Sequence, residues 1–366
     1  MKKNEIIIFI FYSIYSIIFL IVTTNNLTLN DIIYKANQSD SFEYSEIAKN
    51  FPRLIENSNI IDPHKAQRFL IHYIIGGVSY FSNLDIFLTY KIITYAFAII
   101  TIFFLYFLSK KLNLELRSLI IFFSFFFFNP YTIRYQFFNP AQSHDIIFLL
   151  IGFIFFYSII FNKKINIIIY SYCSMFLRQT SIALIIGSFL FFLLQKKKNK
   201  KLFIFFYIIG FLIILFFLIF IGKYSSQNKF PFIIAYGIFL DGLNNFGQLI
   251  KHLLAPLLSF LPLIFFIFGK RKSIKINKKK IVILLFVCSI IIGQPILTGT
   301  AIGGNVIRLS TLCFPILLSI IFYIFDFKEI LKKRIYFLFL ILFFHIWSLH
   351  PTFSKIIIFD SLRFFN

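Results

Sequence analysis

Eleven apolar runs follow one another along the chain, separated by polar segments, and they constrain the fold more than any other feature of the sequence. A helix that crosses the hydrocarbon core of a bilayer needs about 17–25 apolar residues, and most of these runs reach that length. The runs are residues 6–22, 86–108, 118–131, 145–161, 166–177, 179–194, 202–222, 252–269, 281–297, 309–325 and 335–349.

These runs predict an all-α fold, a polytopic membrane helix bundle of about eleven spans. Runs 118–131, 166–177 and 179–194 are short or poorly separated, and the alternative for residues 166–194 is one long broken helix. A further apolar stretch, Phe69–Phe81, is too brief to span, and we expect it to lie along the outer interface as a juxtamembrane helix. We expect a single transmembrane domain over residues 1–366, with a first outer loop at 23–85, the remaining spans at 86–349 and an outer C-terminal tail at 350–366.

The composition excludes a water-soluble globule. Of the 366 residues, 59% are apolar and 14% are charged, whereas soluble domains have about 45–50% and about 25%. A soluble fold of this size has too little interior to hide so much apolar surface. The three cysteines, Cys173, Cys288 and Cys313, lie inside apolar runs and are interpreted as lipid-buried residues without a redox role.

Lys and Arg gather in alternate polar segments, and this bias predicts the orientation. With the N-terminus in the cytoplasm, the inside segments hold 23 of the 37 basic residues; these segments are 1–5, 109–117, 162–165, 195–201, 270–280 and 326–334. We therefore predict a multi-pass protein of the cell inner (plasma) membrane. The net charge of +23 then reflects topology signals that contact anionic lipid headgroups, and a nucleic-acid partner is not expected.

The first candidate site lies in the first outer loop. Asp40, Glu43, Tyr44 and Ile47 are spaced so that they share one face of a helix. Two carboxylates placed in this way can hold a divalent cation such as Mg²⁺ or Mn²⁺ through their oxygens, or one of them can accept a proton from an acceptor hydroxyl. The alternative is a solvated amphipathic helix that Asp40 caps.

Further polar groups lie at the outer ends of later runs. His144 and Asp145 open the fourth run, where Asp145 is either a site acid or a helix cap. Arg178, followed by Gln179, either clamps a phosphate bidentately or extends to lipid headgroups. Arg308 follows a glycine-containing outer loop.

Arg68 precedes the expected juxtamembrane helix, and the scattered histidines such as His72 are interpreted as structural. All of the candidate groups fall on the predicted outer side. Carboxylates together with Arg68, Arg178 and Arg308 suit a negatively charged lipid headgroup that carries a sugar.

The order of these motifs resembles the GT-C superfamily of integral-membrane glycosyltransferases, which use polyprenyl-phosphate-linked sugars. Asp40-Ser-Phe-Glu-Tyr44-Ser-Glu-Ile-Ala48 is similar to the Asp-x-x-x-Tyr-x-x-x-Ala that follows the first span in many members. Gln67-Arg68-Phe-Leu-Ile-His-Tyr resembles their Arg-rich segment before the second span, and Arg308 resembles their late Arg before a span with Pro. Arg178-Gln179 departs from the family pattern, because many members have an acid where this chain has Gln179.

The resemblance implies a bundle of membrane helices with two juxtamembrane helices in the first outer loop. It implies that Asp40 acts as a base or metal-associated acid, with Asp145 as a second acid and Glu43 as a weaker candidate. Arg178 and Arg308 would bind the donor phosphate.

Tyr44, Arg68, His144 and Gln179 complete the expected substrate site. The expected function is transfer of a sugar from a polyprenyl-phosphate donor to an acceptor on the outer face. A flippase for lipid-linked saccharides, a polysaccharide polymerase and a non-enzymatic membrane subunit are the alternatives, and the oligomeric state is left open.

Overall fold

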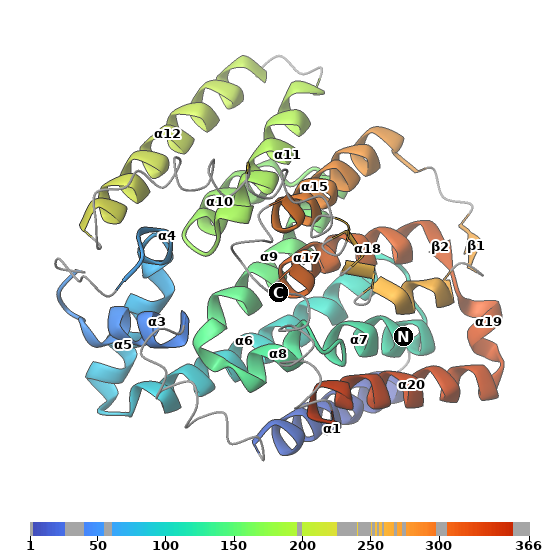
Figure 1. Cartoon of the computed structure of the whole chain (residues 1–366). Coiled ribbons are helices and arrows are strands. Elements are labelled where there is room, and N and C mark those ends of the chain that lie inside the picture. Colours follow the sequence, from blue (N-terminus) through green and yellow to red (C-terminus); the bar gives the residue numbers. More distant parts are fainter. Residues whose placement is uncertain are drawn as a thin grey trace.

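Helices make up nearly all of the chain that the computed structural model describes, which is residues 3–25, 40–54, 61–195, 200–224, 276–297 and 306–353 together with parts of 240–272. Figure 1 shows their arrangement. The elements are α1 (Lys3–Asn25), α3 (Asp40–Lys49), α4 (Pro63–Ala66), α5 (Phe69–Ser82), α6 (Ile86–Lys111), α7 (Leu116–Phe127), α8 (Ile133–Phe138), η1 (Pro140–Gln142), α9 (Ser143–Ile160), α10 (Lys164–Met175), η2 (Gln179–Ser181), α11 (Ile182–Leu193), α12 (Lys200–Tyr224), η3 (Leu261–Phe266), β1 (Lys270–Arg271), α15 (Lys278–Leu297), α17 (Val306–Ser310), η5 (Thr311–Cys313), α18 (Phe314–Ile324), β2 (Phe325–Asp326), α19 (Lys328–Lys332) and α20 (Arg334–Phe353).

Five helices among the described residues are long and apolar enough to cross a membrane, and they make this a multi-pass membrane protein. They are Lys3–Thr24, Ile86–Lys111, Pro140–Ile160, Phe203–Lys223 and Lys278–Ile296. Five shorter apolar helices accompany them: Phe69–Ser82, Leu116–Phe127, Gln179–Leu193, Arg308–Ile324 and Arg334–Leu349. The all-α prediction is confirmed, whereas the prediction of about eleven spans is wrong for the described part of the chain.

The count differs because several apolar runs form helices that are too short to span. The run at 118–131 lies in α7, which has 12 residues, or about 18 Å of helix against a hydrocarbon core of about 30 Å. The stretch 166–194 is divided into α10 and α11, because Arg178 has an extended backbone and a 3-10 turn follows it. The described residues leave out positions 26–39 and 55–60 of the predicted first outer loop, positions 252, 255, 258–259 and 267–268 of the predicted run 252–269, and the predicted tail beyond Phe353.

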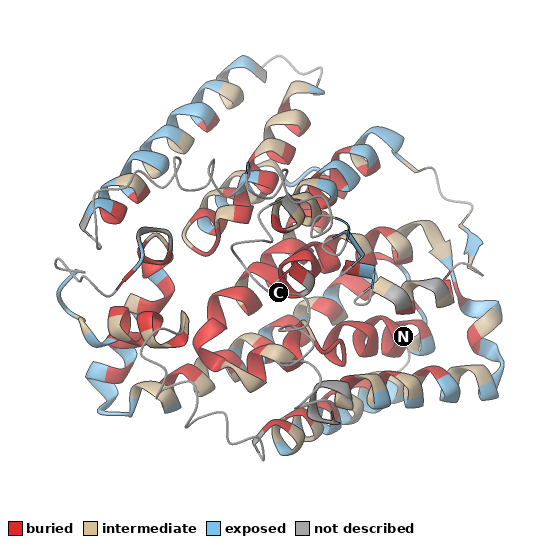
Figure 2. Cartoon of the chain, in the orientation of Figure 1, coloured by how far each residue is buried: buried red, intermediate tan, exposed pale blue. Residues whose placement is uncertain are grey.

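The molecule has a buried centre surrounded by helices with exposed apolar faces (Figure 2). The central helix α9 packs against α6, α10 and α18 and is the most buried of the five candidate spans. In α7 every residue from Ser118 to Phe127 is buried, and Phe123 stacks on Phe127. By contrast α1 and α12 are largely exposed along their apolar length, as expected of helices that face lipid.

The described elements at the two ends of the bundle differ. Helices α3, α4 and α5 lie at one end, and the short antiparallel pair of β1 and β2 lies with α19 at the other (Figure 1). Tight turns end α5, α6 and α9 at Asn83, Asn113 and Asn162, which have positive φ. Asparagine tolerates this backbone conformation better than other residues with a side chain, except aspartate.

Helix α3 lies directly on α5, as predicted for a helix that begins at Asp40 and for one over Phe69–Phe81. The two backbones approach closely at Gly76, where an added Cβ would come within 2.0 Å of the carbonyl oxygen of Ala48. Only glycine permits this approach. The contact fixes the position of α3, and therefore of the acidic residues that α3 contributes.

Candidate functional site

Helix α3 turns one face into the protein, and this face carries the predicted first cluster. Glu43, Tyr44 and Ile47 are buried, while the side chain of Asp40, at the start of the helix, is 38% exposed. The spacing argument thus placed these residues correctly on one face. The solvated amphipathic helix that was the alternative interpretation does not describe this face.

Lys65 of α4 lies between the carboxylates of Asp40 and Glu43. Its Nζ is 2.9 Å from Asp40 Oδ1 and 2.5 Å from Glu43 Oε1. The backbone N–H of Asp62 donates to the other Glu43 oxygen at 2.9 Å. This ion-paired cluster joins α3 to the turn that enters α4.

The ion pairs change the titration of both acids. Burial raises the pKa of Asp40, but the positive charges of Lys65, Arg308 and Arg68 outweigh it and lower that pKa to about 2. Burial raises the pKa of the Glu43 carboxyl above its ordinary value of 4.5, although the hydrogen bonds from Lys65 and the Asp62 backbone oppose this rise. Asp40 is therefore ionised at neutral pH.

Tyr44 stands at the centre of the site. Its ring stacks on His72 of α5 with centroids 4.2 Å apart and meets His144 of α9 edge to face at 4.9 Å. Tyr90 of α6 fixes this arrangement, because its hydroxyl donates to the carbonyl oxygen of Tyr44 at 3.0 Å and lies 2.7 Å from His72 Nδ1. Three helices thereby hold one tyrosine.

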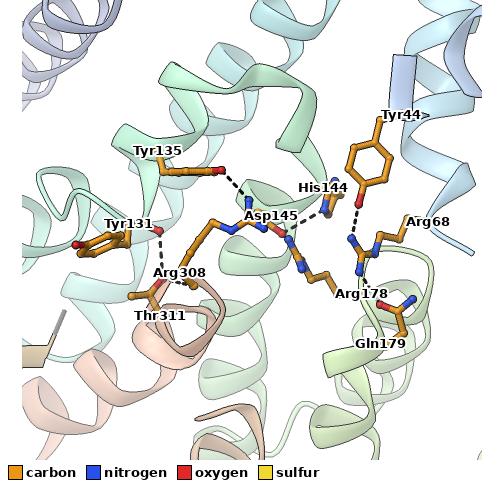
Figure 3. Close-up of polar contacts among 10 residues, drawn as sticks. All are labelled: Tyr44, Arg68, Tyr131, Tyr135, His144, Asp145, Arg178, Gln179, Arg308 and Thr311. Atoms are coloured by element: carbon orange, nitrogen blue, oxygen red, sulfur yellow. Dashed lines mark hydrogen bonds and ion pairs between the residues drawn. The ribbon is translucent and has the colours of Figure 1, made fainter. Parts of the chain in front are cut away.

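Arg68 reaches this tyrosine from the residue just before α5. Its guanidinium group donates to the Tyr44 hydroxyl and, through Nη2, to Gln179 Oε1 at 2.8 Å (Figure 3). Gln179 comes from the break between α10 and α11. Residues that are 111 positions apart in the sequence therefore meet beneath α3.

Asp145 lies in the first turn of α9 and is fully buried. It accepts a hydrogen bond from Arg178 Nε, and His144 Nε2 is 3.4 Å from the same carboxylate oxygen. The other carboxylate oxygen, Oδ2, has no hydrogen-bond partner among the described residues. Asp145 therefore forms an ion pair inside the protein at the start of α9.

Arg308 of α17 completes the set of buried arginines. It donates to the hydroxyl of Tyr135 at 2.9 Å, and its guanidinium carbon lies 4.8 Å from the centroid of that ring. Thr311 continues the chain inward and donates to the Arg308 carbonyl oxygen at 2.6 Å. Figure 3 shows Arg308 and Arg178 approaching the same region from opposite sides of Asp145.

Positive charge exceeds negative charge in this interior region. Arg68, Arg178 and Arg308 are all buried, and Asp145 is the one carboxylate that pairs with any of them among the described residues. Arg68 and Arg308 contact only neutral phenol and amide oxygens there. Arg68 and Arg308 act on the carboxylate of Asp40 only over a longer distance, so an anion bound between the arginines would find guanidinium donors without a close counter-charge.

Several polar atoms in the same region lack a hydrogen-bond partner within the described part of the chain. They are Arg68 Nε, Gln142 Oε1, Ser143 Oγ, both ring nitrogens of His144, Asp145 Oδ2, Arg178 Nη2 and Arg308 Nε. Buried polar groups in native proteins are normally satisfied. Hydrogen-bond donors and acceptors that lack partners in one region suit a ligand that offers both, such as a polyhydroxylated anion.

The acidic pair does not fit a divalent cation in this arrangement. Lys65 Nζ stands between Asp40 and Glu43, and a Mg²⁺ or Mn²⁺ ion would have to displace it. Among the described residues there is no group of three or more His, Cys, Asp or Glu side chains arranged to hold a metal.

Sequence analysis missed four residues of the site. Lys65, His72, Tyr90 and Tyr135 all contact predicted site residues. Lys65 carried a signal, because it precedes Arg68 by three residues in a basic segment. The other three carried none, since aromatic residues and isolated histidines are common throughout this chain.

Comparison of the chain with protein-family models, with curated proteins and with solved structures found no match.

Proposed function

We propose that this protein is an integral-membrane glycosyltransferase that moves a sugar from a polyprenyl-phosphate donor to an acceptor at the outer face of the membrane. The observation that carries the proposal is the excess of buried guanidinium charge around Asp145. Arg68 and Arg308 have neutral partners only among the described residues. A phosphate monoanion or diester supplies the missing negative charge and accepts several N–H donors at once.

The bilayer explains why the phosphate belongs to a lipid. The arginines are buried inside a protein whose outer helices expose apolar faces (Figure 2). A polyprenyl chain can remain in the lipid while its phosphate enters the site from the side. Arg178 and Arg308 bind that phosphate, and Asp145 holds the Arg178 guanidinium in place.

The proposed chemistry is a displacement at the anomeric carbon of the sugar. The acceptor hydroxyl oxygen forms a bond to this carbon, the bond from this carbon to the phosphate oxygen breaks, and polyprenyl phosphate leaves. The acceptor proton passes to Asp40, which is ionised at neutral pH because its pKa is lowered to about 2. The arginines offset the charge that develops on the departing phosphate.

The remaining predicted residues bind and orient the sugar. Tyr44 presents a ring edge and a hydroxyl, and His144 and Gln179 lie beside it. Glu43 is held by Lys65 and Asp62 and supports Asp40 from within α3. We assign no separate catalytic step to Glu43.

The test has a binding arm and a transfer arm. In the first, purified protein in lipid nanodiscs is titrated with undecaprenyl phosphate and with the neutral alcohol undecaprenol, and bound lipid is counted by native mass spectrometry. We expect the phosphate to bind and the alcohol to bind far more weakly. Equal binding of the two lipids contradicts the proposal.

The transfer arm uses a panel of polyprenyl-phosphate hexoses and pentoses with a radiolabelled sugar, added to membranes that contain the protein. We expect one donor to lose its label to an acceptor, and Asp40→Asn to abolish the loss while membrane insertion and abundance persist. Full activity of Asp40→Asn would remove the mechanism. Movement of labelled lipid between leaflets without cleavage would instead identify a flippase.

A further inference from the structure

Lys65 occupies an unusual position among the charged residues of the site. Its Nζ lies 2.9 Å from Asp40 Oδ1, 2.5 Å from Glu43 Oε1 and 3.5 Å from Asp62 Oδ2. The side chain is only 8% exposed. A single ammonium group thus lies where three carboxylates converge.

Carboxylate oxygens are the ligands that a hard divalent cation prefers, but with an ammonium group between them these three acids are not arranged to hold a metal. The ammonium group of lysine is a compact charge with three donors that can point to different oxygens. The second oxygen of Glu43 is also engaged, because the backbone N–H of Asp62 donates to it at 2.9 Å. The protein therefore supplies, from its own chain, both the cation and the donors that these acids require.

We propose that Lys65 takes the place of a divalent metal ion between Asp40 and Glu43, so that this acidic cluster is held together without a metal. The inference concerns the site of the proposed glycosyl transfer and rests on that function only for the role of Asp40. Lys65 is a positioning residue in this arrangement. It binds no substrate itself and acts through the carboxylates that it holds.

Lys65 is also joined through the backbone to Arg68. The backbone N–H of Arg68 donates to the carbonyl oxygen of Lys65 at 3.0 Å, and Arg68 donates to the Tyr44 hydroxyl. The turn from Lys65 to Arg68 therefore contacts α3 at two places. Lys65 pairs with the carboxylates of α3, and Arg68 donates to the Tyr44 hydroxyl. Lys65 therefore links Asp40 to the segment of chain that carries Arg68.

A lysine differs from a metal ion in what it does to Asp40. Its charge lowers the pKa of Asp40 and keeps the carboxylate ionised, and because the ammonium group is part of the chain, no chelator can remove it. Metal chelators should therefore have no effect on this cluster. Substitution of Lys65 should remove the contacts that hold the carboxylates of the cluster together.

The first experiment measures bound Mn²⁺ by electron paramagnetic resonance in the purified full-length protein, in wild type and in Glu43→Gln. We expect the two proteins to bind the same amount, since no Mn²⁺ occupies this cluster. Loss of one equivalent of Mn²⁺ on Glu43→Gln would overturn the proposal. The measurement needs no turnover, so its result is independent of whether the protein transfers sugar.

The second experiment asks whether the vacated position accepts a metal. Lys65→Ala leaves Asp40, Glu43 and Asp62 around a space that had held an ammonium group, and we expect it to bind about one additional Mn²⁺. The double variant Lys65→Ala/Glu43→Gln should lose that ion. Lys49→Ala is the matched control, because Lys49 pairs with Glu46 on the exposed side of α3. This variant should leave Mn²⁺ binding unchanged. Failure of Lys65→Ala to gain Mn²⁺, with the protein folded, contradicts the inference.

A pH profile separates positioning of Asp40 from a merely structural role. In Lys65→Gln the acid limb of the transfer rate should move to higher pH, because Asp40 loses its nearest positive charge. Lys65→Arg, which keeps the charge, should retain an acid limb near that of the wild type. An unshifted acid limb in Lys65→Gln would mean that Lys65 does not act through Asp40.

Discussion

Arg308 is held by Tyr135 alone among the described side chains, through a hydrogen bond of 2.9 Å and a contact between the guanidinium group and the ring. A phenol oxygen accepts a hydrogen bond but brings no negative charge. Arg68 likewise donates to a phenol, the hydroxyl of Tyr44. In contrast, Arg178 has Asp145. The three arginines therefore differ in how much of their charge is available to a ligand, and Arg308 and Arg68 have the most.

This difference gives a prediction for lipid binding. Arg308→Gln removes a charge-assisted contact worth about 1.5–3 kcal/mol, so the affinity for undecaprenyl phosphate should fall about 10-fold to 100-fold. Native mass spectrometry in nanodiscs measures the change.

Arg117→Gln is the matched control, because Arg117 donates to the carbonyl oxygens of Leu331 and Lys332 at the other end of the bundle. Its affinity for the lipid should equal that of the wild type. A comparable loss in both variants would indicate a general effect of charge removal.

The acidic cluster gives a prediction for pH. The pKa of Asp40 is lowered from 3.8 to about 2, so its contribution to stability is present above about pH 4 and is lost as pH falls through about 2. Because burial raises the pKa of Glu43 above 4.5, the contribution of Glu43 has the opposite sign, and ionisation of Glu43 opposes folding as pH rises.

The melting temperature in detergent, measured for wild type and for Asp40→Asn between about pH 7 and pH 3, checks the first of these contributions. The advantage of wild type over Asp40→Asn should be constant near neutral pH and should shrink below about pH 4. A difference that grows on acidification would show that Asp40 is not stabilised as an anion.

At the scale of elements, the site depends on how α3 lies against α5. Gly76 allows the carbonyl oxygen of Ala48 to approach its Cα, and Tyr44, one turn away on α3, stacks on His72 of α5. The same two helices therefore carry the close backbone contact and the aromatic contact. A shift of α3 moves Asp40 and Tyr44 together.

Gly76→Ala tests this dependence. The new methyl group would lie 2.0 Å from the Ala48 carbonyl oxygen, so α3 must move, at a cost of about 1–3 kcal/mol. We expect a lower melting temperature and a loss of sugar transfer.

Gly293→Ala in α15 is the control, because a Cβ there would meet nothing within 4 Å and alanine favours a helix. It should melt at the wild-type temperature or slightly above it. If Gly76→Ala behaves like Gly293→Ala, the close approach is not needed.

At the scale of the molecule, the two ends of the bundle have different chemistry. The predicted site lies at the end with α3 to α5, while the other end has β1, β2 and α19 (Figure 1). At the latter end, lysines neutralise helix termini: Lys272 Nζ donates to the carbonyl oxygens of Leu112 and Phe322 at 3.1 and 2.9 Å. Basic side chains near helix C-termini are favoured by the helix dipole.

The predicted orientation is testable by labelling. Ser82→Cys lies at the end of α5 and Lys111→Cys at the end of α6, and both positions are exposed. In a background without the native cysteines, a membrane-impermeant maleimide added to intact cells should label Ser82→Cys and should not label Lys111→Cys. Permeabilised cells, in which both must react, provide the control. The reverse pattern would place the site in the cytoplasm.

The sequence alone determined the class of the protein, because apolar runs of this length and number have a favourable environment only in a bilayer. It also placed Asp40, Glu43 and Tyr44 on one face of a helix, since helical spacing is a local property. It overcounted the spans, because an apolar run such as 118–131 can also form a short helix buried inside the protein, here the 12 residues of α7, and composition alone does not separate the two cases.

Only the tertiary structure decided the partners. Arg68 meets Tyr44 and Gln179, Arg308 meets Tyr135, and Lys65 meets Asp40 and Glu43, and no local rule brings such distant positions together. Sequence spacing fixes which side chains share a helix face. Packing between helices, through contacts such as Gly76 against Ala48, fixes which faces meet, and with them which charges remain without a counter-charge.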